Sequence, residues 1–324
     1  MNRNRLLQYS IAKGIGPSAI KKLLKYLANN KLSLDDLDDH FEECINTVCS
    51  NPEIIANIHL MENAAVKLGK ELSDRGIKIL VESDCTYPQF LARSLGKNCP
   101  PILFASGNIQ LLNSPSVGFC GSRKTSVKGL NIAEDCVTQL VEKKITIVSG
   151  YASGTDLAAH KKALQCGGKT IFVLAEGILR FSIKREIRDM INLENHVFIS
   201  QFMPNITWNA SNAMKRNSVI IGLSQAMMLI ESGRTGGTFA AGEEALHLKC
   251  PLFVIDYAHP EISAEANHYF IERGGIPVRK TNGEPSLTNL FAMLQKNDSR
   301  VCGDTSSDDT PHEEFWQTSL FQDI

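Results

Sequence analysis

Four consecutive residues, Gly121-Ser122-Arg123-Lys124, combine a glycine, a hydroxyl, a guanidinium and an ammonium group. They follow the short apolar run 117–120, and helical periodicity begins only after them. A run of this length that stops at a glycine is typical of a buried strand ending in a turn. Backbone amides exposed by glycine near a helix start, with cations beside them, form a site for anions. The pattern therefore predicts that this turn binds a phosphate.

Three further strand ends carry similar residues, in the segments 149–160, 212–224 and 231–238, and a polar loop with a tryptophan precedes the second of them. Ligands of parallel α/β sheets bind outside the carboxyl ends of the strands, so we expect these segments to meet at one rim. Each segment alone could be a helix cap or a surface charge, but four at one edge favour a shared anion site. The candidate residues on these further segments are Gly150, Trp208, Lys215, Arg216 and Asn217.

The chain shows no Ser/His/Asp arrangement, no metal cluster and no cofactor motif. The glycines fit neither a dinucleotide-binding Gly-x-Gly-x-x-Gly nor a Walker A loop. His160 follows Asp156 by four positions, so the two residues share one face of a helix. This spacing favours His160 as a partner of Asp156 on that face rather than as a general base. His40, Cys44 and Cys49 have no fourth ligand at matching spacing, so we expect no zinc site.

Composition limits the possible partners. The chain has 324 residues, 43% of them hydrophobic, and a net charge of −1, so any nucleic-acid site must be a local basic patch. No apolar run approaches the roughly 20 residues that span a bilayer. The nine cysteines form no Cys-x-x-Cys pair, which indicates reduced thiols and a cytoplasmic location, away from membranes.

Periodicity divides the chain into three regions. Residues 1–72 read as helices, and the segment Gly14–Leu24 fits either a helix-hairpin-helix that faces a phosphate or a plain tight turn. Residues 75–285 alternate strands with helices, which predicts an α/β domain with a doubly wound, mostly parallel sheet. Residues 286–324 hold one amphipathic segment and an acidic tail that cannot bury enough apolar surface to order itself. The predicted strands are 77–81, 102–105, 117–120, 145–149, 170–175, 197–200, 226–230 and 252–256.

Several motifs in one order resemble the DNA-processing protein A family (DprA, also called Smf). The resemblance is carried by GSRKTSVKG (121–129), VSGYASGTDLAAHKKAL (148–164), GGKTIFVLAEGI (167–178) and MKRNSVIIGLSQAMMLIE (214–231), after the lead-in YPQFLARSL and PPILFASGN. It implies a Rossmann-like protein that binds single-stranded DNA, protects it and hands it to a RecA-type recombinase. It also implies a homodimer that catalyses no reaction.

The resemblance assigns roles to two groups of residues. Gly121, Ser122 and Arg123 would grip a backbone phosphate, and the segment 215–217 would form a second basic element. The chain departs from the family pattern at three places. Ala213 stands where the family has a base-stacking Phe, RFSIKREIRD replaces a Tyr-Pro-x-x-Asn stretch, and Asp256-Tyr257 replaces a Pro-Gly pair. The pathway, whether transformation, recombination or defence, stays open.

An enzymatic alternative rests on a second resemblance. MKRN followed by GRTGGTFAAGEEA is similar to the lysine-decarboxylase-like phosphoribohydrolases (the LOG family), which bind nucleotides and cleave an N-glycosidic bond. Arg216 and either Glu243 or Glu244 would then be catalytic. The third glycine of that family's loop is missing here, and the glutamates come several residues too late. Release of free base from nucleoside monophosphates would distinguish this alternative from DNA binding.

The last residues, FWQTSLFQDI, resemble the short peptide by which bacterial repair proteins dock on the sliding clamp. Gln317, Leu320 and Phe321 stand in the order Gln-x-x-Leu-Phe. The amide would hydrogen-bond at the rim of the clamp pocket, and the two apolar side chains would enter an apolar cleft. The alternative is that this segment packs back onto the protein's own surface.

Overall fold

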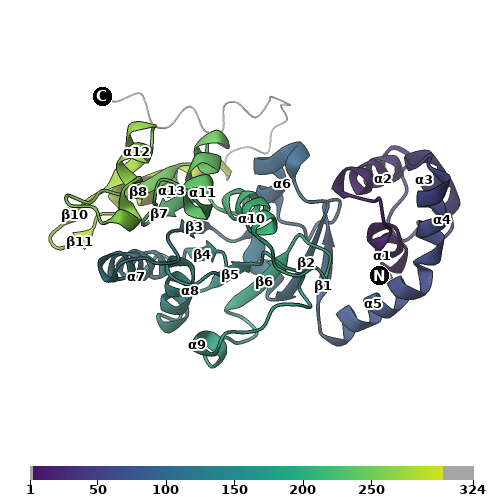
Figure 1. Cartoon of the computed structure of the whole chain (residues 1–324), viewed down its shortest axis with the longest axis horizontal. Coiled ribbons are helices and arrows are strands. Elements are labelled where there is room, and N and C mark those ends of the chain that lie inside the picture. The colour runs from purple at the N-terminus through teal and green to yellow at the C-terminus, as the bar shows by residue number, and fades with distance from the viewer. Residues whose placement is uncertain (1–2, 302–324) are drawn as a thin grey trace.

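The computed structural model describes residues 3–301 and begins with a lobe of five helices (Figure 1). These are α1 (Asn4–Ile11), α2 (Pro17–Asn29), α3 (Phe41–Val48), α4 (Pro52–Leu60) and α5 (Glu62–Asp74). Helix α2 illustrates why they form, because Ile20, Leu23 and Leu27 recur at helical spacing and are all buried. The helical region ends at Asp74, slightly beyond the sequence-based boundary at residue 72.

A nine-stranded sheet forms the centre of the molecule, with strand order β1-β2-β6-β5-β4-β3-β7-β8-β9. The strands from β6 to β9 in this order are parallel, and only the pairings of β2 with β1 and with β6 are antiparallel. The strands are β1 (Lys78–Val81), β2 (Ile102–Gly107), β3 (Ser116–Cys120), β4 (Thr146–Ser149), β5 (Thr170–Val173), β6 (His196–Ser200), β7 (Ala226–Leu229), β8 (Leu252–Ile255) and β9 (Ile276–Val278).

The predicted fold class is confirmed: an α/β fold with a doubly wound, mostly parallel sheet after N-terminal helices. All eight predicted strands are present within one or two residues of their expected ends. The sequence analysis missed β9 and the small ribbon of β10 (Lys280–Thr281) and β11 (Glu284–Pro285). Strand β9 has only three residues and contains Pro277, so it gave no apolar run to detect.

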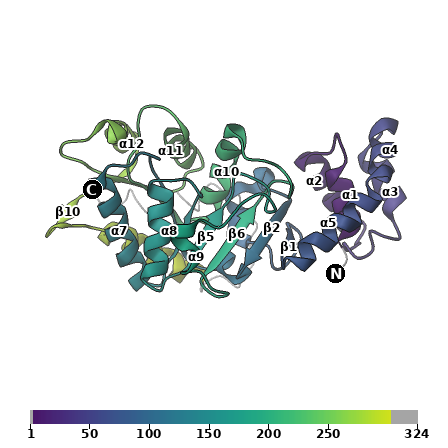
Figure 2. The same cartoon turned by 60° about the horizontal axis from the view of Figure 1, so that its bottom comes forward.

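Helices cover both faces of the sheet (Figures 1 and 2). Helices α7 (Val127–Glu142), α8 (Thr155–Gln165) and α13 (Thr288–Val301) bury one face. Helices α6 (Gln89–Leu95), α10 (Ala210–Leu223), α11 (Gly237–His247) and α12 (Asn267–Glu272) bury the other. The remaining short elements are α9 (Arg185–Arg188), η1 (Gly96–Asn98), η2 (Ile109–Asn113) and η3 (Ile262–Ala264). Among the described residues, no helix combines the length and apolarity needed to cross a membrane.

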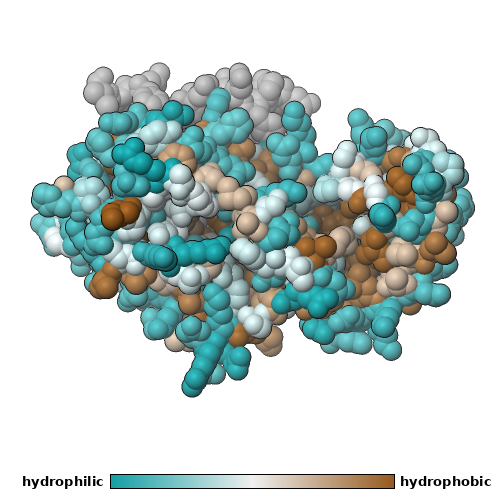
Figure 3. Space-filling model, in the orientation of Figure 1, coloured by the Kyte–Doolittle hydropathy of each residue, from teal (hydrophilic) through white to brown (hydrophobic). Residues whose placement is uncertain are grey.

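The helical lobe adjoins the antiparallel edge of the sheet. Arg3 pairs with Asp84 at 2.8 Å, and the Lys21 ammonium lies 3.3 Å from the Glu82 carboxylate. One apolar cluster continues from the lobe into the sheet residues around Phe104. Hydrophobic residues gather over this lobe in the surface view, whereas the face of the sheet domain is largely hydrophilic (Figure 3). The division into domains at residues 72–75 stays a proposal.

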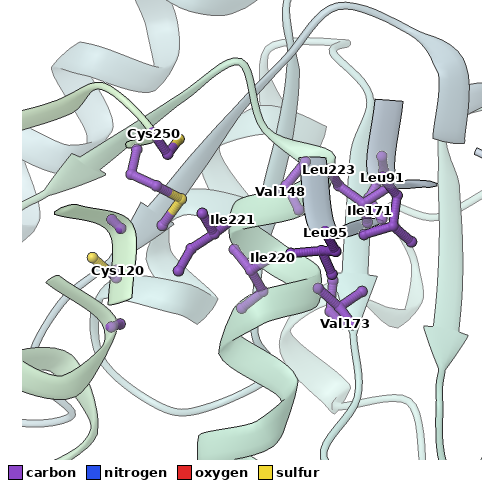
Figure 4. Packing of buried hydrophobic residues seen from close by; sticks show 14 of the residues in the cluster. Leu91, Leu95, Cys120, Val148, Ile171, Val173, Ile220, Ile221, Leu223 and Cys250 are labelled. Carbon is purple, nitrogen blue, oxygen red and sulfur yellow. The ribbon is translucent and has the colours of Figure 1, made fainter. Parts of the chain in front are cut away.

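Packing beneath α10 holds the strand ends in place. Ile220, Ile221 and Leu223 of this helix pack against the strands and against α6 (Figure 4). Fully burying one such side chain contributes about 1.5–3 kcal/mol. This apolar face fixes α10 on the sheet, so the polar residues on its first turns are aimed at the carboxyl edge.

Candidate nucleic-acid interface

A cavity lies at the carboxyl ends of β3 and β7, where the chain reverses its direction across the sheet. Strands β3, β4, β5 and β6 follow one another toward one edge of the sheet, and β7 then pairs with the other side of β3. The switch point therefore lies between β3 and β7. Crevices at such points are the usual ligand sites of doubly wound sheets. We call this cavity of about 310 Å³ the central pocket.

The structure brings together most of the residues selected from the sequence. The central pocket is lined by Gly121, Ser122, Arg123, Arg216 and Asn217, together with residues from the start of α11. Lys124 and Lys215 are exposed and are not part of its lining. Gly150 lies beneath the pocket against Arg216, and Trp208 lies beside Arg123.

Arg123 and Arg216 occupy different environments in the same pocket. Arg123 is exposed at the mouth, whereas Arg216 is 8% exposed and donates to the carbonyl of Val173 at 3.0 Å. Burial lowers the pKa of Arg216, and the Asp156 carboxylate opposes this effect. Among the described residues, the buried Nε of Arg216 has no hydrogen-bond partner. Arg216 therefore lies at the bottom of the pocket with one N–H group that has no hydrogen-bond partner there, and it is not part of an exposed basic surface.

Asp156 is the acidic partner of this floor. Its carboxylate accepts from the amide of Ala152 at 3.3 Å and is buried. Burial raises the pKa of Asp156, and the charge of Arg216 lowers it. The pair limits the net positive charge at the floor, so an incoming anion must also be met by Arg123 at the mouth.

Glycine is required at two positions around the pocket. A Cβ atom on Gly150 would overlap the Arg216 guanidinium and the Asp156 carboxylate. A Cβ atom on Gly121 would overlap the side chain of Thr155 at the start of α8. Both glycines thus permit close packing of the loops that bring these charged groups together.

His160 supports the loop that carries Gly150. Its Nε2 lies 2.6 Å from the Gly150 carbonyl, and its Nδ1 lies 2.6 Å from the hydroxyl of Thr170. A carbonyl only accepts, so Nε2 donates to Gly150. The Thr170 hydroxyl also donates to the carbonyl of Ile147 at 3.0 Å. Burial lowers the pKa of His160 to about 3. The hydrogen-bond partners of His160 are therefore Gly150 and Thr170, on the loop after β4 and on β5, rather than Asp156 on its own helix face.

Glu231 has a role that the sequence analysis did not assign. Its carboxylate accepts from the amide of Ser126 at 2.9 Å and from the Ser126 hydroxyl at 2.5 Å, and the residue is 1% exposed. Ser126 is the N-cap of α7, so a buried negative charge already balances the dipole of that helix. Anion binding at this turn therefore depends on Arg123 rather than on the helix terminus. The sequence does contain a signal for this role, because Glu231 directly follows the predicted buried strand 226–230.

Helix α11 presents an open N-terminus on the opposite side of the pocket. Its N-cap is Gly236, and no described side chain caps it. Thr235, Gly237 and Thr238 line the pocket, and Asn217 donates to the carbonyl of Gly237 at 3.4 Å. Uncapped amides at a helix start bind anions. The pocket therefore offers a guanidinium on one side and a helix terminus on the other.

Two exposed apolar side chains lie near the pocket: Met214 in its lining, and Trp208 outside the lining, beside Arg123. The Arg123 guanidinium lies 5.6 Å from the ring centroid of Trp208, which is 50% exposed. Met214, which lines the pocket, is 41% exposed. An aromatic ring next to a cation is the combination that binds stacked bases of a single strand.

The structure does not assemble the residues of the hydrolase alternative. Glu243 lies 3.7 Å from Arg273 of the neighbouring helix α12, and neither Glu243 nor Glu244 lines the central pocket. Among the described residues, no group of His, Cys, Asp and Glu could hold a metal ion. The predicted clamp-binding residues Gln317, Leu320 and Phe321 lie outside the described residues.

Fold and pocket together define a Rossmann-like protein with an arginine-lined pocket at the switch point of its sheet. Comparison with known proteins then gives the family. The family model of DNA recombination-mediator protein A matches residues 78–284, and the chain belongs to this family. Its members are recombination mediators. They are DNA-binding proteins and not enzymes.

Individual relatives support the assignment. The chain is 30% identical to DNA processing protein DprA of Streptococcus pneumoniae over 294 residues, or 88% of this chain and 99% of the relative. It is 30% identical to Protein Smf of Escherichia coli, covering 65% of this chain and 56% of that protein. The crystal structure of the pneumococcal protein superposes with a TM-score of 0.72 at 27% identity, covering 86% of this chain and 95% of that one. A structure of DNA processing protein A from Helicobacter pylori, titled for its single-stranded DNA binding mode, superposes with a TM-score of 0.54 at 19% identity. The match covers 69% of this chain and 96% of that one.

Proposed function

We propose that this recombination mediator binds single-stranded DNA in the central pocket without sequence preference. The observation that carries the proposal is the pairing of exposed Arg123 with exposed Trp208 at the mouth of the pocket. The cation can meet a backbone phosphate while the ring stacks on a base. The relative from Helicobacter pylori, whose structure is titled for single-stranded DNA binding, supports the same ligand for this fold.

The phosphate fits the pocket for electrostatic reasons. Arg123 faces the open N-terminus of α11 across the cavity, and the spare donor of Arg216 lies at the floor. Lys124 and Lys215 are exposed outside the lining, where they would contact neighbouring phosphates. The carboxylate of Asp156 is turned to Gly150 and Ala152 and is held by the Arg216 charge. The binding is therefore a local property of a chain whose net charge is −1.

Replacing Arg123 tests this proposal. A charge-assisted hydrogen bond to phosphate contributes about 1.5–3 kcal/mol, so we expect Arg123→Ala to weaken strand binding by one to two orders of magnitude, roughly. Fluorescence anisotropy with a labelled oligonucleotide measures the loss. Arg75→Ala is the matched control, because Arg75 is exposed at the C-cap of α5 and pairs with Glu71. Binding curves of Arg123→Ala that overlay those of the wild type at several salt concentrations would refute the phosphate site.

We further propose that the protein acts in the cytoplasm as a homodimer that protects the strand and assists loading of a RecA-type recombinase. A dimer would place two central pockets on one strand and increase its effective affinity without new contacts. Light scattering of the free and strand-bound protein tests the dimer. Nuclease digestion of the strand, followed by filament formation on addition of the recombinase, tests protection and loading. A monomer that leaves the strand open to nuclease would contradict this proposal.

We also propose the bacterial sliding clamp as a partner of residues 317–321, on the evidence of the sequence alone. A peptide of residues 312–324 should bind the clamp by itself, because its Gln amide and two large apolar side chains suit a pocket with an apolar cleft. The double substitution Leu320→Ala with Phe321→Ala should abolish that binding in the full chain. Both changes should leave DNA affinity and melting temperature intact. A large fall in melting temperature would show that the segment packs on its own domain.

A further inference from the structure

A second cavity lies at the same carboxyl edge of the sheet, on the face covered by α7. Its volume is about 360 Å³, and it is bounded by the first turns of α7, the ends of β8 and β9, and strand β11. Ile132, Ile255 and Val278 form an apolar floor, and each is 3–4% exposed. We call it the Tyr257 pocket, after the residue that follows β8 and forms its aromatic wall.

The rim of the Tyr257 pocket is basic. Lys128, Arg279 and Lys280 line it, and Asp256 is the single acid among its lining residues. Asp256 pairs with the Arg279 guanidinium at 2.8 Å, so this carboxylate is already neutralised. The ammonium groups of Lys128 and Lys280 remain to attract an anion. An apolar floor below a cationic rim suits a ligand with a flat apolar part and a negative group.

The aromatic wall is suited to stacking. The ammonium of Lys128 lies 5.2 Å from the centroid of the Tyr257 ring. Burial raises the pKa of Tyr257, and the neighbouring Glu231 carboxylate raises it further, so the ring stays neutral. A neutral ring beside a cation is the pairing already seen for Trp208 and Arg123 at the central pocket. The two pockets thus repeat one arrangement.

The turn that precedes α7 connects the two pockets. Arg123 lines the central pocket, Lys128 lines the Tyr257 pocket, and exposed Lys124 lies between them in the chain. Glu231, the acid that is hydrogen-bonded to Ser126 of this turn, is 1% exposed. A polyanion that leaves the central pocket over this turn would pass Arg123, Lys124 and Lys128. The exposed carboxylate of Glu261 also acts on Tyr257.

From these contacts we infer that the Tyr257 pocket is a second nucleotide-binding site for the strand held in the central pocket. The base lies against Tyr257 and the apolar floor, and its phosphate meets Lys128 and Lys280. The inference rests on the proposed function, because it requires a single strand at the central pocket. A nucleotide fits better than an acidic peptide, since the pocket lies at the end of a cationic path from a phosphate site.

Oligonucleotides of two lengths test the inference. One of about 4 nucleotides reaches only the central pocket, and one of about 16 nucleotides reaches both. We expect Tyr257→Ala to weaken binding of the long strand roughly 5- to 150-fold and to leave the short strand unaffected, because one stacked base is lost. Lys128→Ala, a surface change that keeps the fold, should also weaken only the long strand. Lys143→Ala, at the opposite end of α7, is the matched control.

The outcomes separate the two proposals. If Arg123→Ala leaves binding of both lengths unchanged, the proposed function fails, whatever Tyr257 does. If Arg123→Ala weakens both lengths while Tyr257→Ala and Lys128→Ala weaken neither, the second site is wrong and the central pocket stands. Tyr257→Phe should bind the long strand like the wild type, since the ring is kept. A change of oligomeric state in Tyr257→Ala, measured by light scattering, would identify the pocket as a contact between two copies and overturn the inference.

Discussion

Arg123 and Arg216 show how position decides the role of a residue. Arg216 lies under the loop of Gly150, donates a hydrogen bond to the Val173 carbonyl and faces Asp156. Its guanidinium therefore interacts mainly with groups of the protein itself. Arg123 stands at the mouth beside Trp208 and is exposed to a ligand. Substitution of Arg216 therefore risks the fold as well as binding, and Arg123 is the cleaner probe of the site.

Trp208 provides a spectroscopic test at the scale of a single residue. The chain has two tryptophans, so Trp316→Phe leaves Trp208 as the reporter. We expect an oligonucleotide to quench its emission, because a base stacks on a ring that is 50% exposed. Trp208→Ala should weaken binding by about 1–3 kcal/mol. Unquenched emission at saturating strand would exclude Trp208 as a stacking residue.

The sequence predicted the types of these residues better than their burial. Glycines and cations after apolar runs can be seen in the chain, and five of the nine selected residues line one pocket. The sequence did not separate buried Arg216 from exposed Lys215, because the two side chains point only about 100° apart on α10 and the apolar pattern does not show which of them faces the sheet. It also gave no role to Glu231, since the partner of this carboxylate is the N-cap of α7, which only the packing of the fold brings next to it.

At the scale of elements, α8 and β5 support the central pocket through His160. The imidazole joins Thr170 of β5 to the carbonyl of Gly150, and its ring lies 3.9 Å from that of Phe172. The elements themselves could be predicted, because short apolar runs mark β4 and β5. The hydrogen bonds between them could not, since they join residues ten positions apart through the packing of the fold.

A pH dependence follows from His160. Its folded pKa is about 3 against a reference of 6.5, so below pH 6.5 the unfolded chain takes up a proton that the folded chain refuses. Stability is then complete above pH 6.5 and is lost as the pH falls toward the folded value, by about 1.4 kcal/mol per unit. Urea unfolding between about pH 7 and about pH 5 should show this slope, and it should be shallower in His160→Gln. Parallel profiles for both proteins would contradict the assignment.

At the scale of the whole molecule, the sheet order explains why distant segments form one site. Strands β3 and β7 are more than a hundred residues apart in the chain but are hydrogen-bonded neighbours, with Val117 opposite Ala226. The sequence predicted strands and a common edge, but the order of strands in the sheet depends on packing that no local pattern records. The helical lobe lies next to β1, which is one edge strand of the sheet. It contacts the sheet domain through ion pairs such as Arg3 with Asp84.

The distribution of charge over the whole molecule predicts the salt dependence of binding. With a net charge of −1, the chain has no general attraction for DNA, so only local cations release counterions. Two cations, Arg123 and Arg216, line the central pocket, and exposed Lys124 and Lys215 are their neighbours in the chain. The slope of log K against log salt is about −0.7 per phosphate on a single strand, which gives about −3 for a short oligonucleotide.

Titration of anisotropy at several salt concentrations measures this slope. Lys215→Ala should reduce its magnitude by about 0.7 and cost less affinity than Arg123→Ala, because an exposed ammonium contributes mainly through the counterion it releases. The Arg75→Ala control should keep the wild-type slope. A slope near zero would mean that phosphates are not the contacts of the central pocket. A much steeper slope for the short strand would mean that DNA also binds cations elsewhere on the molecule.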